Sequence, residues 1–197
     1  SRPISRPGLS SGGRPVASVQ RSFANRTAIA LWAGAIVLFG GTYLLNPFGV
    51  PSLDPRLRVF GLTVFRTPAG SMVPTMKPNT LFIVSAWPYA RRSPRAGDIM
   101  VFRYPPDPSV FYVKRLIAVE GDVVSISRCV AVVNGKKLHE PYIAPVEHPD
   151  SDICNAEGYS VPKGQLYVLG DARENSADSR LWGFVPRGNV LAKVLGH

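Results

Sequence analysis

The residue best placed to act as a nucleophile is Ser71, in the segment Pro-Ala-Gly-Ser-Met-Val-Pro-Thr at 68–75. Prolines on both sides constrain the turn, and the apolar run before it predicts that the serine follows a strand. The hydroxyl is therefore expected to have a fixed position. Gly-Ser pairs are also common in ordinary turns, so a plain turn serine is the alternative when this segment is taken alone.

Lys114 is the one lysine that lies inside an apolar run of strand length, among six Lys and seventeen Arg in the chain. Alternate residues of a strand share a face, which places Lys114 with Tyr112, Leu116 and Ala118. Burial disfavours the ammonium form and lowers the pKa, so a neutral amine becomes available as a general base. The alternative is an edge lysine whose amine reaches water.

A third segment, Gly-Asp-Ala-Arg-Glu-Asn-Ser-Ala-Asp-Ser-Arg-Leu-Trp-Gly at 170–183, gathers acids, arginines and serines after an apolar run. We expect ion pairs and hydroxyl hydrogen bonds to hold this loop in one conformation. Four of its charged residues are expected to shape a site rather than to react: Asp171, Arg173, Asp178 and Arg180.

The elements that must position these residues read as strands. Apolar runs separated by turn residues lie at 59–65, 81–87, 98–104, 110–119, 122–126, 129–133, 165–169 and 189–195. This pattern predicts an all-β domain over 59–197. Asn134-Gly135 predicts a two-residue type I′ turn, because both of its positions need positive φ. The segment at about 128–162 is therefore expected to be a hairpin excursion from the main sheets.

Residues 27–45 form a stretch of nineteen residues without a charge. As a helix it would rise roughly 28 Å, about one hydrocarbon thickness, which predicts a transmembrane helix. A cleaved signal peptide is the alternative, but it has a shorter apolar core and small residues at a cut site, and no A-x-A pattern follows here. Residues 46–58 read as a Pro-rich linker.

The 26 residues before this stretch carry five arginines and no acid. Positive residues stay on the cytoplasmic side of a short flank, so we expect a cytoplasmic N-terminus and an extracytoplasmic body. The mixture of Pro, Gly, Ser and Arg at 1–26 predicts a disordered tail. A nucleic-acid role is not expected, because this tail has no interleaved aromatic residues and no folded reader beside it.

Length and composition agree with this organisation. A chain of 197 residues fits one domain plus an anchor and excludes two large domains. Hydrophobic residues make up 45% and charged residues 18%, which is too apolar for a disordered chain. The net charge of +10 suits nucleic acid or an anionic membrane surface, but half of it lies in the tail.

The chain has two cysteines, Cys129 and Cys154. Outside the cytoplasm they are candidates for a disulfide, and free thiols are the alternative. Two cysteines without a further ligand cluster make no zinc site, so no metal is expected.

Taken together from about Pro68 to Val185, these segments resemble the type I signal peptidases, the serine-lysine proteases that remove signal peptides from exported proteins. The resemblance rests on Gly70-Ser71-Met72-x-Pro74-Thr75, on Lys114-Arg115 leading to Gly121-Asp122, on the polar loop at 170–183, and on the strand Asp98-Ile-Met-Val-Phe-Arg-Tyr-Pro. Each motif is weak alone, but three in this order behind an anchor are specific.

The resemblance implies a role for each matched residue. Ser71 is the nucleophile, Lys114 is the general base, and Ser176 is the hydroxyl that orients the lysine amine. It also implies a β fold of two antiparallel sheets beside the membrane, like that of signal peptidases and repressor-type proteases. No cofactor is implied.

The chain departs from the family pattern at four positions. Ala118, Glu120 and Ala172 stand where the family often has Gly, Pro and Asn, and these concern loop shape. Ala69 stands where many relatives have a hydroxyl residue that helps to bind the oxyanion. The Ser71 backbone N–H is then the expected oxyanion donor.

The expected function is a single-pass serine endopeptidase of the cytoplasmic (inner) membrane that cleaves signal peptides from exported preproteins. Expected partners are the signal peptide as substrate and membrane lipid, with a secretion translocon as a candidate and no nucleic acid. A dedicated processing peptidase of a conjugation or pilus precursor has the same motifs.

Three further alternatives differ from this expectation in class or chemistry. An inactive signal-sequence-binding protein is separated from an enzyme by whether an added preprotein is cut. A self-cleaving repressor is disfavoured because it carries a DNA-binding segment rather than an anchor. A Ser-His-Asp enzyme is disfavoured because His139, His148 and His197 all read as surface residues.

Overall fold

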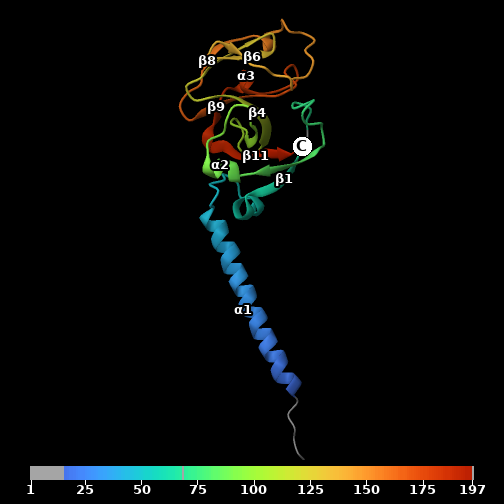
Figure 1. Cartoon of the computed structure of the whole chain (residues 1–197), viewed down its shortest axis with the longest axis vertical. Helices are drawn as coiled ribbons and strands as arrows, with labels where there is room; N and C mark the ends of the chain where they lie inside the picture. The colour runs from blue at the N-terminus through green and yellow to red at the C-terminus, as the bar shows by residue number, and fades with distance from the viewer. Residues whose placement is uncertain (1–15, 68, 197) are drawn as a thin grey trace, which may run out of the picture. The chain divides into compact units, whose positions relative to one another are not determined.

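The computed structural model describes residues 16–67 and 69–196, with side chains from residue 25 onward. The chain divides into two compact units, with the boundary between Gly41 and Thr42. Most of the N-terminal helix belongs to the first unit, and the sheets belong to the second (Figure 1).

Helix α1 (Val16–Leu45) contains the predicted apolar stretch. Its residues Asn25–Leu45 are long and apolar enough to cross a membrane, judged by length and composition, and their side chains are largely exposed. The helix begins before residue 27, so residues 16–26, which the sequence assigned to a disordered tail, are helical in the structure. The rest of that predicted tail, residues 1–15, lies outside the described residues.

The predicted linker ends in a short π-helix, η1 (Arg56–Phe60), which is followed by Gly61 with φ of 68°. A Cβ at Gly61 would lie 2.7 Å from Trp87 Nε1, so the chain passes close to that ring. Strand β1 (Leu62–Arg66) consequently begins three residues later than the apolar run at 59–65 suggested.

Seven antiparallel strands form the large sheet, in the order β1-β2-β11-β3-β4-β9-β10. After β1 these strands are β2 (Leu81–Ser85), β3 (Ile99–Arg103), β4 (Phe111–Val119), β9 (Gln165–Leu169), β10 (Val185–Pro186) and β11 (Val190–Gly196). Strand β4 lies between β3 and β9, and β1 is an edge strand. Lys114 is paired with Met100 of β3, near the middle of the sheet.

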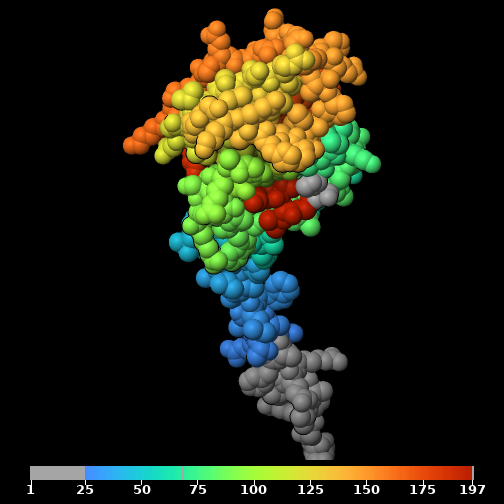
Figure 2. All heavy atoms as spheres, turned by 45° about the horizontal axis from the view of Figure 1, so that its top comes forward, coloured from blue at the N-terminus to red at the C-terminus, as the bar shows by residue number. Residues whose placement is uncertain are grey.

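The second sheet has four antiparallel strands in the order β7-β6-β5-β8. They are β5 (Val123–Ser127), β6 (Val130–Val133), β7 (Lys136–Lys137) and β8 (Ala156–Ser160). Asn134 and Gly135 have φ of 51° and 76°, as the predicted type I′ turn requires. The excursion thus includes β5 and begins before residue 128. Its residues, yellow and orange, form one face of the second unit in Figure 2.

Two apolar clusters explain how the sheets are held. One packs β1, β2, β3 and β11 around Met72 and Met76, which come from the loop that carries Ser71. The other lies between the sheets and joins β4 and β9 to β5 and β6. Short helices α2 (Trp87–Arg91), η2 (Asp152–Cys154), α3 (Ser179–Trp182) and η3 (Arg187–Asn189) complete the chain. The predicted fold class, all-β with two antiparallel sheets behind an N-terminal apolar helix, is confirmed.

Candidate active site

Ser71 lies in the loop between β1 and β2, and this loop is fixed at its base and in its middle. At the base, the Thr67 N–H donates to the Thr80 carbonyl at 3.0 Å and its hydroxyl donates to the Lys77 carbonyl at 2.8 Å. In the middle, Met72 is completely buried directly after Ser71. The loop therefore holds the half-buried serine in one position, as the sequence suggested.

Lys114 lies opposite this serine. Its Nζ is 2.6 Å from Ser71 Oγ, within hydrogen-bond distance, although the two residues are 43 positions apart. Only 4% of Lys114 is exposed, so the alternative of an edge lysine with its amine in water does not describe the structure. The ring of Tyr112, on the same face of β4, lies 5.4 Å from the amine.

Burial lowers the pKa of Lys114 from 10.5 to about 8. Asp178 and Asp171 act in the opposite direction through their charge, and Arg180 adds to the lowering. A considerable fraction of the amine is therefore neutral near physiological pH. A neutral amine in contact with a hydroxyl is the arrangement that a serine-lysine base mechanism needs.

A cleft of about 330 Å³ opens beside the two side chains. One wall runs from Phe65 at the end of β1 to Ser71, and the other runs from Val110 to Lys114 along β4. The apolar side chains that line the cleft are those of Phe65, Phe82, Val101, Phe111 and Val113. The cleft thus has room for small apolar groups next to the hydroxyl.

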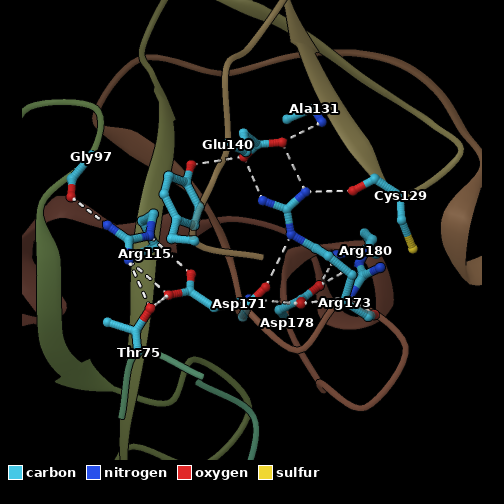
Figure 3. Close-up of polar contacts among 12 residues, drawn as sticks. Thr75, Gly97, Arg115, Cys129, Ala131, Glu140, Asp171, Arg173, Asp178 and Arg180 are labelled. Atoms are coloured by element: carbon cyan, nitrogen blue, oxygen red, sulfur yellow. Dashed lines mark hydrogen bonds and ion pairs between the residues drawn. The ribbon is translucent and has the colours of Figure 1, made fainter. Parts of the chain in front are cut away.

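Arg115, the neighbour of Lys114 on β4, forms a buried ion pair with Asp171 (Figure 3). Its Nε and Nη2 lie 2.9 and 2.7 Å from the two carboxylate oxygens. The Thr75 hydroxyl donates to the same carboxylate, and the ring of Tyr142 lies 3.7 Å from the guanidinium carbon. This pair joins β4, the Ser71 loop and the polar loop after β9.

Asp178 and Arg180 form a second buried pair in the polar loop (Figure 3). Arg180 donates to both carboxylate oxygens at 2.8 Å, and the Gly170 N–H donates to Asp178 Oδ2 at 3.0 Å. Asp178 also caps α3. The arrangement matches the expectation that these charged residues hold the loop, and it brings Asp178 near enough to act on the pKa of Lys114.

Arg173 comes from the same loop, and its guanidinium points toward Glu140 and Cys129 (Figure 3). Its guanidinium donates to both carboxylate oxygens of Glu140 and to the Cys129 carbonyl, and its Nε donates to the Gly170 carbonyl at 3.0 Å. Arg173 is 0% exposed and Glu140 is 1% exposed.

Ser176, which the resemblance assigns to orienting the amine, makes no hydrogen bond to it among the described residues. Its hydroxyl is buried and has no hydrogen-bond partner among the described residues. The hydroxyl does lie beside Gly170, where a Cβ would overlap both Ser176 Oγ and the Ser71 carbonyl. The orienting role of Ser176 therefore stays a prediction.

The other candidates lie away from this chemistry. Cys129 and Cys154 are joined in a disulfide. Within the described residues no group of three His, Cys, Asp or Glu side chains could hold a metal ion. His139 and His148 are exposed, and His197 lies outside the described residues.

Sequence reasoning missed two partners. It gave no role to Arg115 as the counterion of Asp171, or to Glu140 as the counterion of Arg173. Arg115 stands next to Lys114 in a strand of apolar residues, which is a signal for a buried and therefore paired charge. Glu140 offered no such signal, because it follows exposed residues of a hairpin.

The fold and this site are those of a serine endopeptidase, and comparison with known proteins identifies its family. Residues 26–196 match the family described as signal peptidase, peptidase S26, and the chain belongs to this family. It is 34% identical over 146 residues to the probable signal peptidase I-1 of Synechocystis sp., covering 71% of this chain and 72% of that one.

Two further proteins are similar to this chain. The chain is 35% identical over 147 residues to signal peptidase I of Bacillus caldolyticus, covering 70% of this chain and 80% of the relative. A crystal structure of a signal peptidase I from Enterococcus faecalis V583 aligns with 53% of this chain and 97% of its own, at 32% identity and a TM-score of 0.44. The chain is accordingly a hydrolase of the serine endopeptidase class, and its relatives support signal peptide cleavage.

Proposed function

We propose that this chain is a membrane-anchored peptidase that cleaves signal peptides from exported preproteins with a Ser71–Lys114 dyad. The observation that carries the proposal is the 2.6 Å contact between Ser71 Oγ and the amine of a lysine that is only 4% exposed. The polar loop at 170–183 supports it, because Asp171 of this loop pairs with Arg115 of β4 and Asp178 pairs with Arg180 within the loop.

The reaction proceeds through an ester intermediate. Neutral Lys114 takes the proton of the Ser71 hydroxyl while the oxygen attacks the scissile carbonyl. The tetrahedral intermediate collapses, the peptide C–N bond breaks, and the Lys114 ammonium returns the proton to the leaving amine. Water then attacks the Ser71 ester and gives its proton to the same lysine. The ester C–O bond breaks, Ser71 Oγ regains the proton from the Lys114 ammonium, and the carboxylic acid product is released.

The oxyanion is held by the backbone N–H of Ser71. This N–H has no partner within the described part of the chain, so it is available to the developing negative charge. Ala69, two residues earlier, has no hydroxyl to add. The oxyanion site of this chain therefore depends on the backbone to a greater degree than that of relatives with a hydroxyl there.

The substrate binds as an extended peptide in the cleft. Strand β1 is an edge strand, so its free backbone groups can pair with the peptide, as in other β-strand additions. The apolar lining of the cleft accepts small apolar side chains next to the cut. The preference for small residues is taken from the family resemblance.

The chain is anchored by the apolar part of α1, with the N-terminus in the cytoplasm and the sheets on the extracytoplasmic side of the cytoplasmic membrane. Five arginines before the uncharged stretch at 27–45 support this orientation. Protease added to right-side-out vesicles should digest the catalytic unit and leave the N-terminal tail intact. Digestion of the tail with protection of the catalytic unit would reverse the assignment.

Cleavage itself is tested with the full-length chain in detergent and a secreted preprotein. The wild-type chain should cut the preprotein at one position, and N-terminal sequencing of the product should place the cut at the end of the signal peptide. Ser71→Ala should fold normally and leave the preprotein uncut. An active Ser71→Ala variant contradicts the proposal, and cleavage restricted to one precursor would identify a dedicated processing peptidase.

A further inference from the structure

Arg173 makes several buried polar contacts, although it takes part in no step of the proposed reaction. It is the largest completely buried side chain in the described part of the chain, and its counterion Glu140 is equally hidden. A guanidinium buried to this degree must satisfy its donors, and Arg173 does so with Glu140 and with the carbonyls of Cys129 and Gly170. The two carbonyls belong to the second sheet and to the loop that flanks the nucleophile.

Gly170 is the point at which this network reaches Ser71. Both polar atoms of its peptide groups are held by charged side chains, the N–H by Asp178 and the carbonyl by Arg173, each at 3.0 Å. No space remains between Gly170 and the Ser71 carbonyl, since a Cβ on the glycine would overlap it. A displacement of Gly170 therefore changes the support behind the nucleophile.

The disulfide fixes the far end of the network. Arg173 donates to the carbonyl of Cys129, and Arg180 donates to the carbonyl of Ile153, the residue before Cys154, at 2.8 Å. Cys129 and Cys154 are bonded to each other through sulfur and through a backbone hydrogen bond of 2.8 Å. Arg173 and Arg180 thus donate to carbonyls on either side of one disulfide. Arg173 also donates to the Gly170 carbonyl, and Arg180 holds the Asp178 carboxylate that accepts from the Gly170 N–H.

We propose that Arg173 is a positioning residue for the Ser71–Lys114 dyad, and that the Cys129–Cys154 disulfide fixes the carbonyl acceptors on which Arg173 and Arg180 depend. This inference rests on the proposed function and adds to it a dependence of catalysis on the second sheet. Loss of the Arg173 guanidinium, or of the disulfide, leaves Gly170 less firmly held. Displacements of about 1 Å in a catalytic arrangement can cost about 10²-fold in rate.

Lys114 provides a readout that does not depend on cleavage. The charges that act on its pKa come from Asp178, Arg180 and Asp171, which all lie in the polar loop, and the main effect is burial. Movement of the loop admits water to the amine and changes the distances from the amine to these charged groups. The entry of water has the larger effect, because burial is the main cause of the lowered pKa. The pKa of Lys114 then rises from about 8 towards the ordinary value of 10.5.

The test uses the full-length chain in detergent with two kinds of variant. Arg173→Lys keeps a positive charge beside Glu140, but one ammonium cannot replace the fork that reaches both the Cys129 and Gly170 carbonyls. The double variant Cys129→Ala with Cys154→Ala removes the disulfide and leaves Arg173 in place, and it carries the test if Arg173→Lys does not fold. Arg128→Ala is the matched control, because its side chain, adjacent to Cys129, makes an exposed ion pair with Asp150.

We expect kcat to fall about 10²-fold in Arg173→Lys and about tenfold in the cysteine double variant, with KM changed by less than about twofold. The Lys114 titration, followed by NMR of the lysine side-chain carbons and assigned with Lys114→Met, should move to higher pH in both variants and stay unchanged in Arg128→Ala. Folded variants that keep both the wild-type kcat and the wild-type Lys114 titration would overturn the inference, even if they are less stable in urea. An inactive wild-type chain would refute the proposed function instead, and the titration would still decide the positioning role.

Discussion

Two neighbouring basic residues, Lys114 and Arg115, lie on opposite faces of β4 and have opposite kinds of partner. Lys114 lies on one face with its amine against a serine hydroxyl, and no carboxylate of the described residues forms an ion pair with it. Arg115 lies on the other face, where the Asp171 carboxylate meets its guanidinium with two hydrogen bonds. Both side chains are buried, so burial alone does not distinguish a catalytic cation from a structural one.

The difference lies in what each group can do with its proton. A guanidinium keeps its charge at any physiological pH, so burying it requires a counterion. An amine without a counterion responds to burial by giving up its proton, and the pKa of Lys114 is lowered for this reason. One face of the strand therefore holds loops together, and the other carries the proposed base.

The largest expected effect comes from removing the unpaired cation. Lys114→Met should lower kcat by about 10³-fold or more, because the general base is lost, and it should raise the stability of the fold, because a desolvated amine is replaced by an apolar side chain. Lys114→Arg should be equally inactive, since a guanidinium cannot accept the serine proton. Rates on one preprotein and urea unfolding give both quantities, with the exposed Lys163→Met as control.

Removing the paired cation should have the opposite effect on stability. Arg115→Met leaves the completely buried Asp171 carboxylate without its counterion and should lower the free energy of unfolding by about 3–5 kcal/mol. Urea unfolding measures this change. Arg128→Met, which breaks an exposed pair, should change stability by less than about 1 kcal/mol. Equal effects of the two substitutions would remove the distinction between the faces of β4.

The disulfide between the β5–β6 turn and η2 should contribute comparably to stability. The disulfide joins residues 25 positions apart, and closing such a loop is worth roughly 3 kcal/mol in the chain-entropy model. The double variant Cys129→Ala with Cys154→Ala should lose about that much in urea unfolding. Two freely labelled thiols in unreduced, unfolded wild-type protein would show that the bond does not form in the protein's own compartment.

A smaller gain is expected at Ala69. A hydroxyl directed at the oxyanion acts only in the transition state, so Ala69→Ser should raise kcat by about tenfold and leave KM nearly unchanged. The gain should stay below the full worth of an oxyanion donor because a free rotor must be held in place. Kinetics of Ala69→Ser and Ala69→Gly on one preprotein give the comparison, and a kcat in the serine variant no higher than wild type would mean that the oxyanion site is completed in another way.

Local patterns predicted much of this molecule. Alternation along the strand placed Lys114 with Tyr112 and Leu116, and Asn134-Gly135 gave the β6–β7 turn, because both depend on geometry over a few residues. Ala118 was predicted on the same face, but the register shifts after Leu116 and Ala118 packs between the sheets. The predicted start of the helix was wrong. Composition assigned residues 16–26 to a disordered tail, but they form the first part of α1.

Contacts that depend on the tertiary fold were not predictable in this way. Arg115 and Asp171 are 56 positions apart and Arg173 and Glu140 are 33 apart, so their pairing depends on how distant segments come together in the fold. The sequence showed that the loop at 170–183 would be held by charge. It did not show that one of its arginines would reach the segment beside a disulfide.

The central claim, that Lys114 is the base, is tested most directly by the pH dependence of cleavage together with that of stability. The account predicts that kcat rises with pH through a midpoint near 8, where the buried amine loses its proton. The folded chain binds fewer protons at Lys114 than the unfolded chain between about 8 and 10.5, so this residue should make the wild type gain stability, relative to Lys114→Met, as pH rises through that window. A kcat that is independent of pH across that midpoint, or a stability difference that does not change there, would contradict the assignment of Lys114 as the base.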